Sequence, residues 1–169
     1  RASRQWLEFR RVLFRSKINN LTVQNGVYNF NIADTFTIEG TLSNSANGEV
    51  HLKSGNLIIN NYTGEGKIYL YKGATLTITN YAGTGTIYLQ EGATLTIENA
   101  TENPNIEIQT TTDERDFATI STNGNLTISS ATYNSGDIKT NGNITLPSTE
   151  STTNEIGNLL IENGDLTIE

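Results

Sequence analysis

Aromatic side chains recur at a fixed interval in the middle of this 169-residue chain, and exposed aromatic side chains are chemically suited to binding sugars. Tyr69 and Tyr88 occupy the same place in two matching stretches, KIYLYKGATLTIT and TIYLQEGATLTIE, nineteen residues apart. A phenol ring can stack on the apolar face of a sugar ring, and its hydroxyl can form a hydrogen bond. We therefore predict six candidate glycan contacts on the outside of the fold: His51, Tyr62, Tyr69, Tyr71, Tyr81 and Tyr88.

The same residues also have a purely structural interpretation, which we favour from the sequence. Aromatic side chains at matching positions of neighbouring strands stabilise a sheet by packing on one another. His51 is the only histidine and has no obvious acidic partner, so we expect a packed or solvated surface histidine. Asn61, Asn80 and Asn99 recur at the same interval and predict a structural ladder, in which side-chain amides form hydrogen bonds from repeat to repeat.

Threonines form another recurring set, and we expect them to share one outward column. Its members are Thr22, Thr37, Thr77, Thr96, Thr127, Thr145 and Thr167. A regular threonine row on a flat face resembles the arrays of ice-binding solenoids, which makes ice binding a remote alternative function. A second column of Thr75 and Thr94 continues as Asn125, Asn143 and Asp165, which weakens that match. Threonine is also the commonest choice for an exposed strand position.

An acidic stretch interrupts the repeats and predicts an insertion loop near residues 109–118. Asp113, Glu114 and Asp116 carry the carboxylate oxygens that calcium prefers. Their spacing matches no calcium-binding loop, and insertions in repeat proteins commonly become loops on one face. We therefore expect a solvated charged loop, and we predict no metal ion and no cofactor.

The residue types argue against catalysis by this segment. Polysaccharide-cleaving sites need clustered acidic and basic side chains on adjacent repeats, which act as acid, base and charge stabiliser. The expected outward positions here hold Thr, Tyr and Asn, and Arg115 is the only arginine after residue 16. We therefore predict that the segment is not an enzyme.

Composition narrows the range of partners. The net charge of −7 disfavours nucleic acid, because neutralising phosphates requires a basic surface. The chain contains no cysteine, so neither disulfides nor thiolate metal sites can form. No run approaches the roughly 18 apolar residues of a membrane helix, so we expect no membrane insertion by this segment.

Residues 1–16 differ in kind from the remainder of the chain. They contain five of the six arginines and the only tryptophan, Trp6, and Glu8 breaks the apolar run that a secretion signal needs. An amphipathic arm is one alternative. We favour an artefactual, non-native leader and exclude it from the fold, and the strand pattern at the other end suggests truncation there as well.

The elements that must position these side chains are short strands. Apolar and polar residues alternate over three to five positions, which is strand periodicity, and Gly or Asn separates the strands. Matching stretches of eighteen to nineteen residues place Leu57, Leu76 and Leu95 in one column. We predict an all-β fold, a single parallel β-solenoid of roughly seven coils of about 18–20 residues, over residues 17–169.

The competing fold is an antiparallel meander. Five Asn-Gly pairs, of which Asn123-Gly124 is one, could form hairpin turns instead of solenoid corners. We favour the solenoid, because a regular repeat stacks like residues on like and lets neighbouring coils share one core.

Coils with the G-A-T-L-T-I pattern of residues 73–78 and 92–97 resemble the repeats of bacterial β-helical adhesins, such as filamentous haemagglutinin-like exoproteins and autotransporter passenger domains. The resemblance implies a secreted or cell-surface structural and adhesive segment that contacts glycans or host and matrix surface proteins. The alternative is a fragment of a carbohydrate-active β-helix enzyme, lyase-like or hydrolase-like, whose catalytic coils lie elsewhere.

Overall fold

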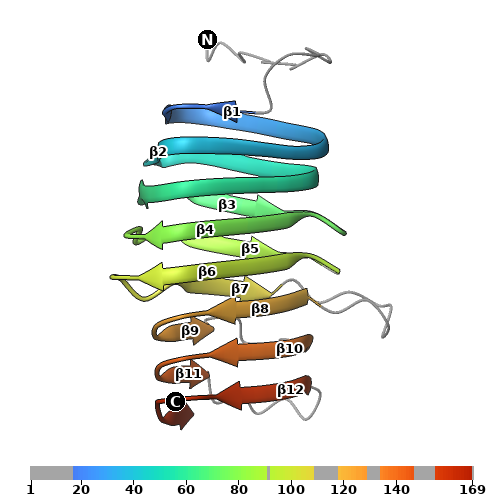
Figure 1. The fold of residues 1–169 in the computed structure, drawn as a ribbon, viewed down its shortest axis with the longest axis vertical. Coiled ribbons are helices and arrows are strands. Elements are labelled where there is room, and N and C mark those ends of the chain that lie inside the picture. Colours follow the sequence, from blue (N-terminus) through green and yellow to red (C-terminus); the bar gives the residue numbers. More distant parts are fainter. Residues whose placement is uncertain (1–16, 91, 109–117, 129–133, 147–154, 169) are drawn as a thin grey trace.

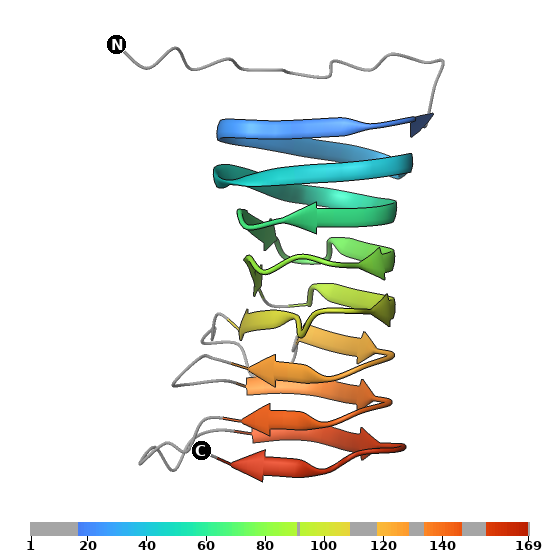
Figure 2. The same cartoon turned by 90° about the vertical axis from the view of Figure 1, so that its left-hand side faces the viewer.

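The chain folds as a parallel β-solenoid of about seven turns (Figure 1). The computed structural model describes residues 17–90, 92–108, 118–128, 134–146 and 155–168, and these residues form thirteen strands and no helix. Figure 2 shows the stack from the side, with the coils at successive levels along the long axis. The prediction of an all-β parallel solenoid is confirmed.

The strands differ greatly in length. β1 is Lys17–Ile18, and β2 runs without interruption from Leu21–Gly64, winding around the axis at the N-terminal end of the stack (Figure 1). The others are β3 (Lys67–Leu70), β4 (Thr75–Tyr81), β5 (Thr86–Leu89), β6 (Thr94–Ala100), β7 (Asn105–Ile108), β8 (Ala118–Thr122), β9 (Leu126–Ile128), β10 (Asn134–Thr140), β11 (Ile144–Leu146), β12 (Glu155–Ile161) and β13 (Leu166–Ile168).

Strand order divides the solenoid into two sides that β2 joins. On one side lie β4, β6, β8, β10 and β12, and on the other lie β3, β5, β7, β9, β11 and β13. Every recorded pairing is parallel, so the ladder hydrogen bonds run from coil to coil along the axis. An antiparallel meander is therefore excluded for the described strands.

Equivalent apolar residues stack in register and form the core. Leu57 pairs with Leu76, Leu76 with Leu95, and Leu95 with Ile120. These four side chains are no more than 1% exposed. The predicted column of leucines is therefore confirmed, and each coil covers the apolar side chains of its neighbours.

Glycines allow the coils to turn and to approach one another. Gly73 and Gly92 stand just before β4 and β6 with φ values of 72° and 64°, a left-handed conformation that favours glycine. At Gly85 an added Cβ would lie 2.0 Å from the main-chain oxygen of Gly66, so two coils come into direct backbone contact there. A side chain at Gly85 would force these coils apart.

The prediction of a single threonine column is wrong, because the later repeats do not continue the alignment of the earlier ones. Thr77 pairs with Thr96 and Thr96 with Ser121 on the β4 side. Thr127 instead pairs with Asn105 of β7, and Thr145 and Thr167 follow it on the β3 side. The row that the ice-binding alternative requires is therefore divided between two sides.

The reason for this error is that both sides of the solenoid select the same local pattern. Leu126 and Ile128 are buried in β9 as Leu76 and Ile78 are in β4, so an L-T-I triplet does not specify its side. The step from Thr94 to its partner Thr119 is twenty-five residues, against nineteen from Thr75 to Thr94. That longer coil shifts the alignment.

Two sequence predictions fall outside the described residues. The leader at residues 1–16 is one of them. The other is the greater part of the predicted insertion loop, with the acidic candidates Asp113, Glu114 and Asp116.

The stacked core gives a direct test of stability. We expect Leu76→Ala to lower the free energy of unfolding by about 2–5 kcal/mol, because it leaves a cavity between two coils. Thr77→Ala, a neighbour on the outward face, should cost less than about 1 kcal/mol. Urea unfolding followed by circular dichroism measures both. Equal losses in the two variants would contradict the assigned inward and outward faces.

Candidate functional site

Three aromatic side chains stack on the outer face of the solenoid, and we call them the aromatic ladder: His51 of β2, Tyr69 of β3 and Tyr88 of β5. Their Cα positions are in register. The ring centroids of His51 and Tyr69 are 4.5 Å apart, as are those of Tyr69 and Tyr88. The two tyrosine rings are nearly parallel, at 10°. The predicted match of Tyr69 with Tyr88 is therefore confirmed, and His51 extends the column into the preceding coil.

Stacking limits what the ladder can bind. Tyr69 packs between His51 and Tyr88, so both faces of its ring are occupied by protein. A sugar ring stacks on an aromatic face, and Tyr69 has no such face to offer. Tyr88 has a second face, turned toward the next coil, where Glu107 holds the equivalent position. The ladder therefore presents ring edges and hydroxyl groups along its length and one ring face at its end.

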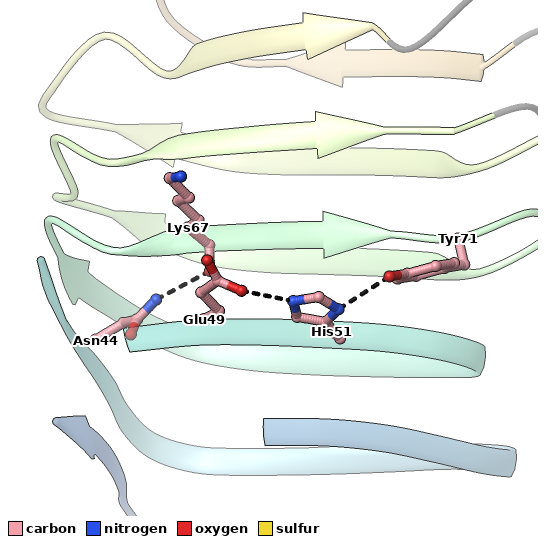
Figure 3. A network of polar contacts seen from close by, with 5 residues as sticks. All are labelled: Asn44, Glu49, His51, Lys67 and Tyr71. Carbon is pink, nitrogen blue, oxygen red and sulfur yellow. Dashed lines mark hydrogen bonds and ion pairs between the residues drawn. The ribbon is translucent and has the colours of Figure 1, made fainter. Parts of the chain in front are cut away.

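A polar network adjoins the ladder (Figure 3). His51 Nε2 lies 3.1 Å from Glu49 Oε2, and His51 Nδ1 lies 2.9 Å from the Tyr71 hydroxyl. A carboxylate only accepts, so Nε2 carries the proton, and Nδ1 of the neutral ring accepts from the Tyr71 hydroxyl. Both nitrogens of His51 are thereby engaged.

The acidic partner of His51 corrects the sequence interpretation. Glu49 stands two residues before His51, so strand alternation places both side chains on the same outward face. The i−2 spacing on a strand was the available signal. Tyr71 comes from the next coil. It directly follows Leu70, the residue of β3 that pairs with Leu52.

Burial governs the protonation of His51. Its side chain is 13% exposed. Loss of solvation lowers the pKa of His51 below its ordinary value of 6.5, although the hydrogen bond that His51 donates to Glu49 opposes this and the positive charge of Lys53 adds to it. The neutral imidazole is therefore the form that the fold favours.

Two lysines lie over the rings of this face. The Lys53 ammonium is 3.2 Å from the centroid of the Tyr71 ring, and the Lys67 ammonium is 6.0 Å from that of Tyr88. The negative charge that the Tyr69 and Tyr88 phenols acquire when they ionise raises the pKa of Lys67, and Glu49 makes a smaller contribution in the same direction. Partial burial separately raises the pKa of Tyr69. Two cationic groups therefore lie beside the phenols of this face.

The prediction that Tyr62 and Tyr81 contact glycans is wrong, because both side chains are 1% exposed and belong to the core. Leu57 and Ile59 point inward, as strict alternation predicts. Tyr62 also points inward although it stands three residues after Ile59, so the alternation shifts by one position between Ile59 and Tyr62. Burial raises the pKa of Tyr62 to about 12. The Tyr81 hydroxyl donates to the carbonyl of Gly85 at 3.4 Å.

The predicted asparagine ladder is confirmed at its first step. Asn80 donates to the side-chain oxygen of Asn61 at 3.1 Å. Asn99 pairs with Asn80 in the strand register, but its amide donates to the main-chain oxygen of Thr79 at 3.1 Å. The side-chain hydrogen bonds of this ladder therefore join Asn61 to Asn80, and Asn99 bonds to the main chain instead.

A second asparagine ladder was not recognised from the sequence. Asn163 donates to Asn141 at 2.8 Å, and Asn141 donates to Asn123 at 2.9 Å. Each of the three precedes a glycine, and that recurring Asn-Gly pair was the available signal.

Within the described part of the chain, no three His, Cys, Asp or Glu side chains gather as a metal site would require. Nor does any described helix have the length and apolar character needed to cross a membrane. Comparisons with protein-family models, curated proteins and solved structures give no match to this chain.

The lowered pKa of His51 predicts a pH effect on stability. An unfolded histidine titrates near 6.5, so as the pH falls below that value the unfolded chain gains a proton before the folded one does. The neutral ring's contribution to stability is therefore present above pH 6.5 and is lost below it. We expect His51→Gln, whose amide can still donate to Glu49, to lose less stability than the wild type between about pH 7.5 and about pH 5.5.

The measurement is the urea midpoint of both proteins at each pH. The carboxylates titrate in both proteins, so their effect on stability cancels when the two pH dependences are compared. Parallel pH dependences would contradict a lowered pKa at His51.

Proposed function

We propose that this solenoid is a non-catalytic structural and adhesive segment of a secreted or cell-surface protein. In this role it holds its strand faces and loops toward glycans or toward host and matrix surface proteins. The aromatic ladder and its lysines are the surface through which it makes contact.

The observation that carries this proposal is the row of phenol edges along the axis. Tyr69 and Tyr88 are partly exposed, and Tyr71 lies beside them at the end of β3. Tyr69 and Tyr71 belong to one coil and Tyr88 to the next, and Lys53 and Lys67 lie nearby. Such a surface offers hydrogen bonds to sugar hydroxyls and positive charge to sugar carboxylates, in an edge-on contact that does not need ring stacking.

Rigidity supports the same proposal. Each ladder residue is fixed by the ring above or below it and by the parallel strands that hold the coils in register. A surface that is already ordered loses little conformational entropy when it binds. Repeated contacts of modest strength along a rod then combine to give useful adhesion.

The polar network supports a non-catalytic role. A general base needs a lone pair free for substrate, but His51 donates to Glu49 through one nitrogen and accepts from Tyr71 through the other. Tyr71 in turn lies under the Lys53 ammonium. These groups hold each other in place on an outer face.

Removing only the phenol hydroxyls tests the edge-on contact. We expect Tyr69→Phe/Tyr71→Phe/Tyr88→Phe to keep the stack of rings and to lose the glycans that the wild type retains on a glycan array. Circular dichroism and the urea midpoint verify that the variant is folded.

The matched control is Thr77→Ala/Thr96→Ala on β4 and β6, the other side of the solenoid. It should keep the wild-type glycan profile. The proposal fails if the triple variant has the profile of the wild type, or if the wild type binds no glycan and no matrix protein.

A further inference from the structure

We propose that Tyr69 and Tyr88 form an oxidative coupling site, where a one-electron oxidant joins the two rings as dityrosine and so links neighbouring coils covalently. The inference is independent of glycan binding. It depends only on the geometry and the exposure of this tyrosine pair.

Geometry places the reacting carbons side by side. The strands pair Tyr69 with Tyr88 in register, and the rings stack with centroids 4.5 Å apart at 10°. Because the rings are nearly parallel and their strands are in register, the ring edges that carry the ortho carbons lie on neighbouring coils close to one another. Rotation about the side-chain bonds must then turn the stacked rings edge to edge, as the bond between two ortho carbons requires.

Exposure distinguishes this pair from the other stacked tyrosines. Tyr62 and Tyr81 also stack, at 5.3 Å and 24°, but each is only 1% exposed. Tyr69 and Tyr88 are partly exposed on the outer face. A bulky oxidant in solution can therefore reach the outer pair, and the buried pair serves as an internal control with similar stacking.

The chemistry balances with two equivalents of oxidant. Each phenol gives one electron to an oxidant molecule and its hydroxyl proton to water, which leaves a phenoxyl radical. The two radicals join through a new carbon–carbon bond between ortho positions, and the hydrogen on each of these carbons moves to the oxygen as the rings regain aromaticity. Two phenols thus yield one dityrosine, two protons and two reduced oxidant molecules.

The linkage would close a covalent loop from Tyr69 to Tyr88, which is one full coil of nineteen residues. A cross-link of that kind restricts the unfolded chain, as a disulfide does. Peroxidase-type iron–oxo species are oxidants of the required class outside cells. The modified rod would resist unfolding at the coils that carry the aromatic ladder.

The test uses the full chain at low concentration with tris(bipyridyl)ruthenium(II), persulfate and a brief flash of visible light. Dityrosine is read as fluorescence in the monomer band of a denaturing gel, and the linked peptides are identified by mass spectrometry. We expect the wild-type monomer to fluoresce, and Tyr69→Phe and Tyr88→Phe each to lose most of that signal.

The control variants separate this site from other tyrosines. Tyr62→Phe and Tyr81→Phe each remove one phenol of the buried pair, and Tyr71→Phe removes the phenol hydroxyl of the ring that lies under Lys53; all three should keep the wild-type signal. Each variant is checked for folding by circular dichroism before irradiation. A wild-type monomer without dityrosine, an undiminished signal in Tyr88→Phe, or loss of the signal in Tyr71→Phe would overturn the proposal.

Discussion

In-register stacking of parallel strands is the constraint on which the whole structure depends. A single coil has too few inward side chains to form a core, so each coil is stable only when another covers it. Leu76 illustrates this, because Leu57 pairs with it from the preceding coil and Leu95 from the following one. The register that buries these leucines also fixes every outward side chain above its equivalent.

The same register creates aromatic stacks both inside and outside the solenoid. Tyr62 and Tyr81 stack within the core, while Tyr69 and Tyr88 stack on the outer face of neighbouring strands. The two pairs have the same residue type and the same nineteen-residue spacing; the outer pair stacks somewhat more closely, and only the inner pair is buried. Burial alone therefore decides which pair solvent, ligands or reagents can reach.

Local alternation predicted much of this from sequence, because side chains alternate between inside and outside over short runs such as Leu57–Ile59 and Leu76–Ile78. The columns of Leu57, Leu76 and Leu95 and of His51, Tyr69 and Tyr88 follow from that alternation and the repeat length. It failed where the period changes. The step from Ile59 to Tyr62 reverses inside and outside across Asn60 and Asn61, where the strand continues without a break.

Longer-range placement was harder to predict for a different reason. Both sides of the solenoid accept the same apolar alternation, so Thr127 and Thr77 have similar neighbours in sequence and lie on different sides. Only the number of residues between strands shows on which side a threonine such as Thr77 or Thr127 lies. A coil of irregular length makes that number an unreliable guide. Glu49 as the partner of His51 was accessible from the i−2 spacing, whereas Tyr71 required knowledge of which coil comes next.

A repeat that places like on like has a general effect on recognition. When identical aromatic residues stand one coil apart, each ring covers a face of its neighbour, so the ring faces stabilise the fold and are not free for ligands. Recognition then passes to the hydroxyl edges, to flanking cations and to the point where the repeat changes. Here that point is the step from Tyr88 to Glu107, where an aromatic column meets a carboxylate. Variation between repeats, more than their sameness, is therefore what can give such a surface specificity.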